Sequence, residues 1–120
     1  MAAKDDLGRD GEQRAATYLD DAGFVVLERN WRCADGEIDI VALDGDEVVV
    51  VEVKTRSSER FGHPFEAVDA RKRARLWRLA GVWCRQHPDL ARGRGVRLDA
   101  VAIIGTGDDE RGVEHLRDLR

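Results

Sequence analysis

The spacing of hydrophobic residues changes several times along the chain, and each change predicts a new element. Helical spacing predicts two helices, and shorter runs of alternating or β-branched residues predict strands. In chain order we expect a helix at 7–22, strands at 24–31, 36–43 and 47–55, a helix at 68–86, a strand at 96–104 and a short edge strand at 113–116. Gly23 fits a C-cap of the first helix, and Pro88 stops the second because the residue before a proline disfavours helix.

This order of elements predicts the fold class. Helices that alternate with strands indicate an α/β protein whose central mixed sheet is flanked by helices. The 120 residues fit a single domain, 1–120. We expect flexible segments at 1–6 and 106–112, and a mobile loop at 56–64, where the sequence is polar and contains glycine.

The hairpin predicted at 36–55 carries the most informative chemistry. Side chains alternate along a strand, so Glu37 shares a face with Asp39, and Glu52 shares a face with Lys54. A two-residue turn at 45–46 sets Asp39 opposite Glu52, and a turn at 44–45 changes the partners but keeps the common face. Only an odd-length loop or a bulge sends the two sets to opposite faces.

Charges at this position are costly. The run 48–53 is nearly all valine, which is typical of a central strand covered on both faces. Burying Glu52 and Lys54 there costs several kcal/mol per ion unless partners or a metal offset it. Asp39 makes the pocket net anionic, which favours a hard divalent cation such as Mg²⁺. The alternative is a salt-bridged hairpin at the edge of the sheet.

A fourth carboxylate lies on the first predicted helix. Glu12 precedes Ala15, Ala16 and Leu19 by helical spacings, which places it on the stripe that faces the sheet. We therefore expect Glu12 to join the same site. The alternative is an exposed acid near the helix N-terminus, where the helix dipole favours it.

Basic residues gather on the second predicted helix and just after it. One face of the helix carries arginines and the opposite face is apolar, so it is either a solvated surface or a stripe that tracks phosphates. Lys72 lies beside the apolar face and is expected to point toward the carboxylates. The arginines concerned are Arg71, Arg75, Arg78 and Arg85 on the helix, with Arg92, Arg94 and Arg97 in the following segment.

Overall composition narrows the class of protein. The net charge of −4 excludes a surface that binds nucleic acid indiscriminately, so basic residues must act locally. No apolar run is long enough to span a membrane, and the first residues lack a secretory signal. The two cysteines, Cys33 and Cys84, form no CxxC pair and are expected to be reduced thiols in a cytoplasmic protein.

Several of these segments together resemble a known family. The sequences Gly8-x-x-Gly11-Glu12-x-x-Ala15, Arg29-Asn30-Trp31-Arg32, Gly36-Glu37-Ile38-Asp39-Ile40-Val41 and Val51-Glu52-Val53-Lys54-Thr55-Arg56 resemble the YraN-like bacterial family of predicted endonucleases. Phe61-Gly62, Lys72 and Arg97-Leu98-Asp99 continue the match. That family is similar in turn to the PD-(D/E)XK nucleases, especially archaeal Holliday-junction resolvases.

The resemblance implies a restriction-endonuclease-like αβββαβ core and a Mg²⁺-dependent endonuclease that hydrolyses DNA, with branched or junction DNA as the expected substrate. Mn²⁺ is expected to substitute for Mg²⁺. The implied catalytic residues are Glu12, Asp39, Glu52 and Lys54, and the implied metal ligands are Asp39, Glu52, the carbonyl of Val53, and Glu12. Phosphate contacts are expected from Arg56, Arg71, Lys72, Arg75 and Arg78.

Other functions stay open at the level of sequence. One alternative is a nucleic-acid-binding module of the same fold that performs no chemistry. Another is a protein-interaction domain without a nucleic-acid partner. A two-fold homodimer is a further expectation, by analogy with the paired scissile sites of a branched substrate.

Overall fold

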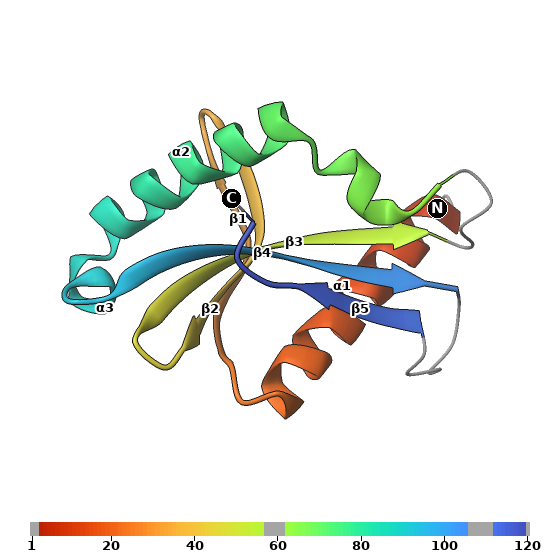
Figure 1. The fold of residues 1–120 in the computed structure, drawn as a ribbon, viewed down its shortest axis with the longest axis horizontal. Coiled ribbons are helices and arrows are strands. Elements are labelled where there is room, and N and C mark those ends of the chain that lie inside the picture. The colour runs from red at the N-terminus through yellow and green to blue at the C-terminus, as the bar shows by residue number, and fades with distance from the viewer. Residues whose placement is uncertain (1–2, 57–61, 106–111, 120) are drawn as a thin grey trace.

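A computed structural model describes residues 3–56, 62–105 and 112–119, with side chains from Asp10 onward. The elements are α1 (Ala3–Asp21), β1 (Val25–Cys33), β2 (Gly36–Asp44), β3 (Glu47–Arg56), the 3₁₀ helix η1 (Pro64–Ala67), α2 (Ala70–Gln86), α3 (Pro88–Ala91), β4 (Gly95–Ile104) and β5 (Val113–Leu116) (Figure 1). This is the predicted α/β class, and its αβββαβ order is the one expected.

The five strands form one mixed sheet in the order β1-β2-β3-β4-β5. The pairs β1–β2, β2–β3 and β4–β5 are antiparallel, and β3–β4 is parallel. A parallel pair needs a long crossover, which η1, α2 and α3 supply between β3 and β4. The central position of β3 explains its valine-rich sequence, since both of its faces are buried.

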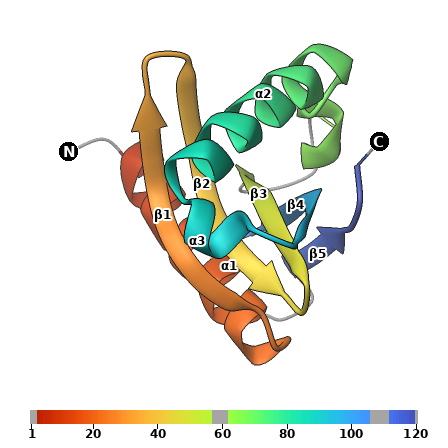
Figure 2. The ribbon, with the colours of Figure 1, turned by 90° about the vertical axis from the view of Figure 1, so that its left-hand side faces the viewer.

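Two helices cover opposite faces of the sheet and create two apolar cores (Figure 2). On one face, Ala15, Ala16 and Leu19 of α1 pack against residues that include Val49 and Val51 of β3. On the other face, the predicted apolar stripe of α2 packs against residues that include Val48 and Val50. That stripe consists of Leu76, Leu79, Ala80 and Trp83, all buried.

The β2–β3 turn has the register that decides the arrangement of the site. Asp44 pairs with Glu47, so the turn contains two residues, 45–46, and Gly45 adopts the left-handed conformation that such a turn favours, with φ 58°. The ladder continues to Ile40 opposite Val51. The first of the two predicted turns is therefore the one formed.

Several boundaries differ from the sequence expectation. Helix α1 begins at Ala3 rather than Leu7, because apolar spacing gives no signal for a turn that carries no apolar stripe. Helix α2 begins at Ala70 rather than at residue 68, because it follows the 3₁₀ helix η1. Helix α3 lies in the segment between the helix predicted at 68–86 and the strand predicted at 96–104. Flexible segments were predicted at 1–6, 56–64 and 106–112. Of these, residues 1–2, 57–61 and 106–111 lie outside the described residues. Within the described part of the chain, no helix is long and apolar enough to cross a bilayer.

Candidate functional site

The site lies where β2 and β3 separate. Beyond the pair Ile40–Val51 the two strands no longer form a ladder, and β2 continues paired only with β1. Ile40 packs in the α1-side core whereas Ile38 packs in the α2-side core, although residues two apart in a regular strand share a face. In β1, Asn30 lies between the pairs Arg29–Ile40 and Trp31–Ile38 and has φ 54°, which marks the same irregularity. Asp39 thus lies at a twist in β2.

The Asp39 carboxylate fills the place of a missing ladder bond. Its Oδ2 accepts a hydrogen bond of 2.8 Å from the backbone N–H of Val53 in β3. This bond orients the carboxylate in the gap between the strands, where groups from both faces of the sheet reach it. The twist therefore lets Asp39 approach Glu12 of α1 and also line a pocket whose other wall is α2.

Three carboxylates converge in this gap. Ligand oxygens of Glu12, Glu37 and Asp39 lie within 4.8 Å of one another. Glu12 comes from α1, which approaches β3 closely at the preceding residue, Gly11, where a Cβ would collide with the side chain of Thr55. Glycine at this position therefore brings Glu12 close to Asp39.

The electrostatics of Asp39 reflect this crowding. Burial raises its pKa, the negative charges of Glu52, Glu12 and Glu37 raise it further, and the Val53 N–H opposes them, so that the pKa reaches about 7. Arg32 forms an ion pair of 2.9 Å with Glu37 and offsets only part of the negative charge. An additional cation would relieve the remaining repulsion.

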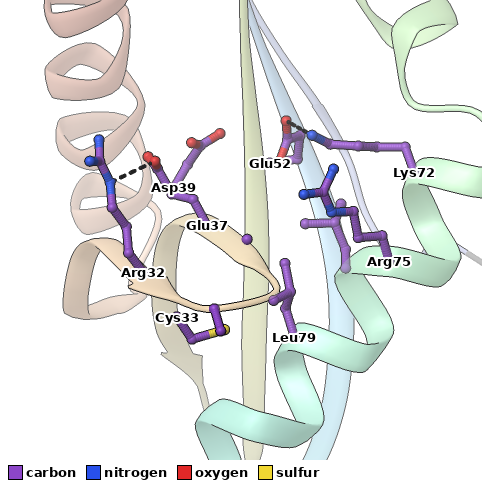
Figure 3. A pocket seen from close by; sticks show the side chains of 11 residues that line it. Arg32, Cys33, Glu37, Asp39, Glu52, Lys72, Arg75 and Leu79 are labelled. Carbon is purple, nitrogen blue, oxygen red and sulfur yellow. Dashed lines mark hydrogen bonds and ion pairs between the residues drawn. The ribbon is translucent and has the colours of Figure 1, made fainter.

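Glu52 lies beside the three acids but has its own cations. Its side chain faces α2 and is buried, with 4% of the residue exposed. Glu52 Oε1 lies 3.2 Å from Nζ of Lys54. It also lies 3.4 Å from Nζ of Lys72 on α2 (Figure 3). The sequence pattern correctly indicated that Lys72 points toward the carboxylates.

A pocket of about 680 Å³ connects these groups to the surface. It lies between α2 and the turn that joins β1 to β2, and its acids are Glu37, Asp39 and Glu52 (Figure 3). Its cations come from both walls: Lys72 and Arg75 from α2, and Arg32 from β1. The remaining lining residues are Cys33, Ala34, Gly36, Leu76 and Leu79. The pocket thus combines the buried Glu52 and the half-buried Glu37 and Asp39 with the exposed Arg32 and Arg75. This combination suits a ligand that carries phosphate.

The structure brings the four expected catalytic residues into one neighbourhood, but not as one cluster. Glu12 and Asp39 share the three-acid group, whereas Glu52 and Lys54 form the adjacent ion pair. Val53 contacts Asp39 through its backbone N–H. The catalytic and metal-binding roles of these residues stay predictions.

The expected phosphate contacts divide into two groups. Lys72 and Arg75 line the pocket, while Arg71 and Arg78 are exposed elsewhere on α2. Arg56, at the end of β3, is also exposed and donates to the carbonyl of Thr55.

One basic residue has a different environment from the one expected. Arg97 is buried in β4, where three acids bind it, so it does not extend the basic surface after α2. Its partners are Asp99 and Asp44 at 2.9 Å and Glu47 at 3.0 Å. The alternation of Arg97 with Asp99 in an apolar strand was the available signal, because two residues of one strand face share an environment.

Two site residues were not assigned roles from the sequence. Glu37 was expected on the Asp39 face, but its closeness to Glu12 depends on the angle at which α1 crosses the sheet. Arg32 lines the pocket because β1 extends to Cys33, two residues beyond its expected end. Only the β1–β2 register places Arg32 opposite Glu37.

Comparison with known proteins places this site in a family. The model of the uncharacterised protein family UPF0102 matches residues 11–103, which include every predicted site residue. The chain belongs to UPF0102. This confirms the resemblance, because UPF0102 is the YraN family.

Similar members of UPF0102 come from several bacteria. The chain is 59% identical to a UPF0102 protein of Paenarthrobacter aurescens over 98% of its own length and 95% of the relative's. It is 56% identical to one from Arthrobacter sp. strain FB24 and 54% identical to one from Beutenbergia cavernae, each over 98% of both chains. These relatives share the family name, which carries no activity.

Proposed function

We propose that this UPF0102 protein is a Mg²⁺-dependent endonuclease that hydrolyses phosphodiester bonds in DNA. The observation that carries the proposal is the convergence of Glu12, Glu37 and Asp39 beside the ion-paired Glu52. Carboxylate oxygens are the ligands that Mg²⁺ prefers, and Mn²⁺ accepts them too. The raised pKa of Asp39, caused first by burial and then by the Glu52 charge, fits a site that is incomplete without a cation.

A bound Mg²⁺ ion would supply a Lewis acid for the phosphate and a more acidic water. The protein's own groups hold the reactants. Asp39, oriented by the Val53 N–H, and Glu12 and Glu37 provide oxygen ligands from two elements. The resemblance adds Glu52 to these metal ligands. Its carboxylate would then bind the metal while it also pairs with Lys54 and Lys72.

The lysines provide the positive charge that phosphate chemistry needs. Lys54 orients the attacking water and stabilises the negative charge that develops on the phosphoryl oxygens. Lys72 shares Glu52 with Lys54 and lines the pocket, so it contacts the phosphate from the α2 side. Arg75 and Arg32 then hold neighbouring phosphates and fix their register without reading sequence.

A divalent-metal titration tests the proposal. Purified protein is incubated with duplex, flap and four-way-junction DNA while Mg²⁺ or Mn²⁺ is varied. We expect metal-dependent cleavage that Asp39→Asn and Lys54→Ala abolish, while Lys54→Ala largely retains DNA binding. Cleavage that persists in either variant, or that needs no divalent metal, contradicts the assignment.

A nucleic-acid-binding module without catalysis is the second candidate. The observation that favours it is that Glu52 already has two lysine partners and needs no metal for neutralisation. In that case gel shifts detect binding whose affinity falls with salt, because phosphate contacts release counterions, but no metal supports cleavage of any substrate. A homodimer stays a separate prediction, and sedimentation equilibrium tests it.

A further inference from the structure

An exposed flank of α2 carries a line of arginines that the proposed chemistry uses only in part. The four residues, here called the arginine stripe, are Arg71, Arg75, Arg78 and Arg85, and all of them are exposed. At about 100° per residue they fall within a sector of about 80°, so they follow one side of the helix. At a rise of about 1.5 Å per residue, the stripe is about 21 Å long.

The charge of α2 is one-sided, in contrast to the chain as a whole. The helix holds six of the 20 lysines and arginines and none of the 24 aspartates and glutamates, although the net charge of the chain is −4. The exposed Arg117, outside α2, pairs with Asp44. Within the described part of the chain, no hydrogen bond or ion pair engages the side chains of Arg71, Arg78 or Arg85. These arginines therefore remain available to an anionic partner.

The stripe passes the acidic pocket and continues beyond it. Arg75 belongs to both, because it also lines the pocket. Arg71 precedes Arg75 by about one turn, whereas Arg78 and Arg85 follow it by about 4.5 and 15 Å toward the C-terminus of α2. Helix α2 lies at the outside of the molecule, across the sheet from α1 (Figures 1 and 2). A long polyanion with one phosphate in the pocket thus has a path along α2.

The surface offers charge without a platform on which bases could stack. Proteins that bind single strands stack successive bases on aromatic side chains. Among the described residues, the large hydrophobic side chains that are exposed are Val25 and Leu116, and neither is aromatic. The tryptophans of α2 belong to the core: Trp83 is buried, and Trp77 packs against the same cluster. Such a surface suits the regular phosphate backbone of a double helix better than a single strand.

From these observations we infer that the arginine stripe binds the phosphate backbone of a double-helical arm of DNA, which extends from the phosphate in the pocket. The stretch of about 15 Å from Arg75 to Arg85 spans about four to five base pairs, since each pair adds about 3.4 Å to B-DNA. The inference rests on the proposed function for the position of the scissile bond. The binding of the duplex itself depends only on the charge and exposure of α2.

The salt dependence of binding tests the inference, because it counts the phosphates contacted. Fluorescence anisotropy measures the affinity for a labelled duplex of about 16 base pairs over a range of salt concentrations, with Ca²⁺ in place of Mg²⁺. We expect Arg78→Gln/Arg85→Gln to weaken binding about tenfold and to reduce the slope of log affinity against log salt by about 1.8, since each lost phosphate contact removes about 0.9. Glutamine retains helix propensity, and an unchanged urea midpoint verifies the fold.

The matched control removes two exposed arginines outside α2. Arg29 donates to Gln13 of α1, and Arg117 lies over the ring of Phe24 in the core on the α1 side. Arg29→Gln/Arg117→Gln changes the net charge equally, so it measures the effect of general electrostatic attraction. We expect it to keep the affinity within about twofold and the salt slope within about 0.5 of the wild-type values.

Three results overturn the inference. An unchanged salt slope in Arg78→Gln/Arg85→Gln, or an equal loss in the control, shows that α2 holds no phosphates. Oligothymidylate with the same number of phosphates that binds as tightly as the duplex, and loses as much affinity in the variant, shows that the stripe accepts a single strand instead. Polyglutamate that displaces the duplex at equal charge concentration shows a surface for acidic proteins.

Cleavage kinetics separate this inference from the proposed function. If both hold, Arg78→Gln/Arg85→Gln raises KM about tenfold and leaves kcat unchanged, because the stripe holds the substrate without contacting the reacting phosphate. Duplex binding with the expected change in slope, but without cleavage under any metal, upholds the stripe and refutes the nuclease. Metal-dependent cleavage with unchanged KM in the variant upholds the nuclease and refutes the stripe.

Discussion

Two aspartates on the same sheet show how partners decide what a buried carboxylate does. Asp39 on β2 has a pKa raised to about 7 by burial and by the charges of Glu52, Glu12 and Glu37, against one backbone hydrogen bond. Asp99 on β4 is fully buried, and burial alone would raise its pKa too. Hydrogen bonds from His115, Arg97 and the N–H of Asp118 outweigh burial and lower the Asp99 pKa to about 2.

The Asp99 network is complete. Arg97 binds both carboxylate oxygens, at 2.9 and 3.0 Å, and His115 Nε2 lies 2.7 Å from Oδ2. Asp118 N–H adds a bond of 3.0 Å to Oδ1. A carboxylate with all its acceptor positions used joins β4 to β5 and to the chain that follows, and has no capacity left for a ligand. The neighbours of Asp39 are acids instead, and this is why we propose that a cation binds there.

The largest expected effect comes from breaking the complete network. Asp99→Asn removes the charge that faces buried Arg97 and leaves it only Asp44 and Glu47 as acidic partners. Because breaking a buried ion pair that is held by two hydrogen bonds is costly, we expect the free energy of unfolding in urea to fall by about 3 kcal/mol. Asp46→Asn in the exposed β2–β3 turn is the matched control and should change it by less than about 0.5 kcal/mol. Equal stability of the two variants would contradict a structural role for Asp99.

The corresponding change at the acid cluster should have the opposite sign. Asp39→Asn keeps an acceptor for the Val53 N–H but removes a charge from among three other acids. Without divalent metal at pH 8, we expect this substitution to raise the free energy of unfolding by about 2 kcal/mol. That is about half of the ~4 kcal/mol that corresponds to raising the pKa of Asp39 from 3.8 to about 7. Urea denaturation measures the difference, and a loss of stability contradicts the electrostatic account.

The pH dependence of the free energy of unfolding tests the direction of the Asp39 pKa shift independently. The folded-state pKa of Asp39, about 7, lies above the ordinary value of 3.8, so its contribution to stability declines as pH rises from about 4 to 7. The advantage of Asp39→Asn should therefore grow over that range and level off above it. The pKa of Asp99 is lowered to about 2, so its contribution is complete above about pH 4 and is lost as pH falls toward 2.

A divalent cation should act on one aspartate only. Mg²⁺ or Mn²⁺ at about ten times its dissociation constant should stabilise the wild-type protein by about 1.4 kcal/mol. Asp39→Asn should abolish most of this effect, and Asp46→Asn should keep it. Thermal unfolding by circular dichroism with and without metal measures the shift. Equal stabilisation of wild type and Asp39→Asn would place the cation elsewhere.

The elements and the hairpin register could be predicted from the sequence because local patterns determine them. Alternation predicted the faces of β3, and Gly45 allowed the turn that sets the register as far as the pair Ile40–Val51. Helical spacing likewise identified the buried face of α2 and the direction of Lys72. All of these depend on residues close together in the chain.

The division of the site into two groups could not be predicted, because it depends on tertiary geometry. The twist of β2 at Asp39 follows from the way β1 and β3 pair with it, and no pattern within β2 marks it. The closeness of Glu12 requires α1 to cross β3 at Gly11. The burial of Arg97 depends on acids from β2, β3 and β4 together, which no single window of sequence contains.

The smallest expected effect lies at the edge of the complete network. The hydroxyl of Tyr18 on α1 lies 3.0 Å from Nδ1 of His115, whose Nε2 bonds to Asp99. Tyr18→Phe keeps the ring that packs against His115 at a centroid distance of 5.4 Å and removes only this hydrogen bond. We expect a loss of about 1 kcal/mol in the free energy of unfolding, the usual net value of one such bond.

Tyr18→Phe also tests whether the Asp99 network influences the acid cluster around Asp39. If Asp99 and its partners only support the fold, Tyr18→Phe should leave both the metal-induced stabilisation and any nuclease rate at wild-type values. Urea unfolding, the thermal shift with Mg²⁺ and the cleavage assay measure the three quantities on one preparation. A change in the metal response larger than the change in stability would couple the network to the acid cluster, because the two are joined through α1, which carries both Tyr18 and Glu12.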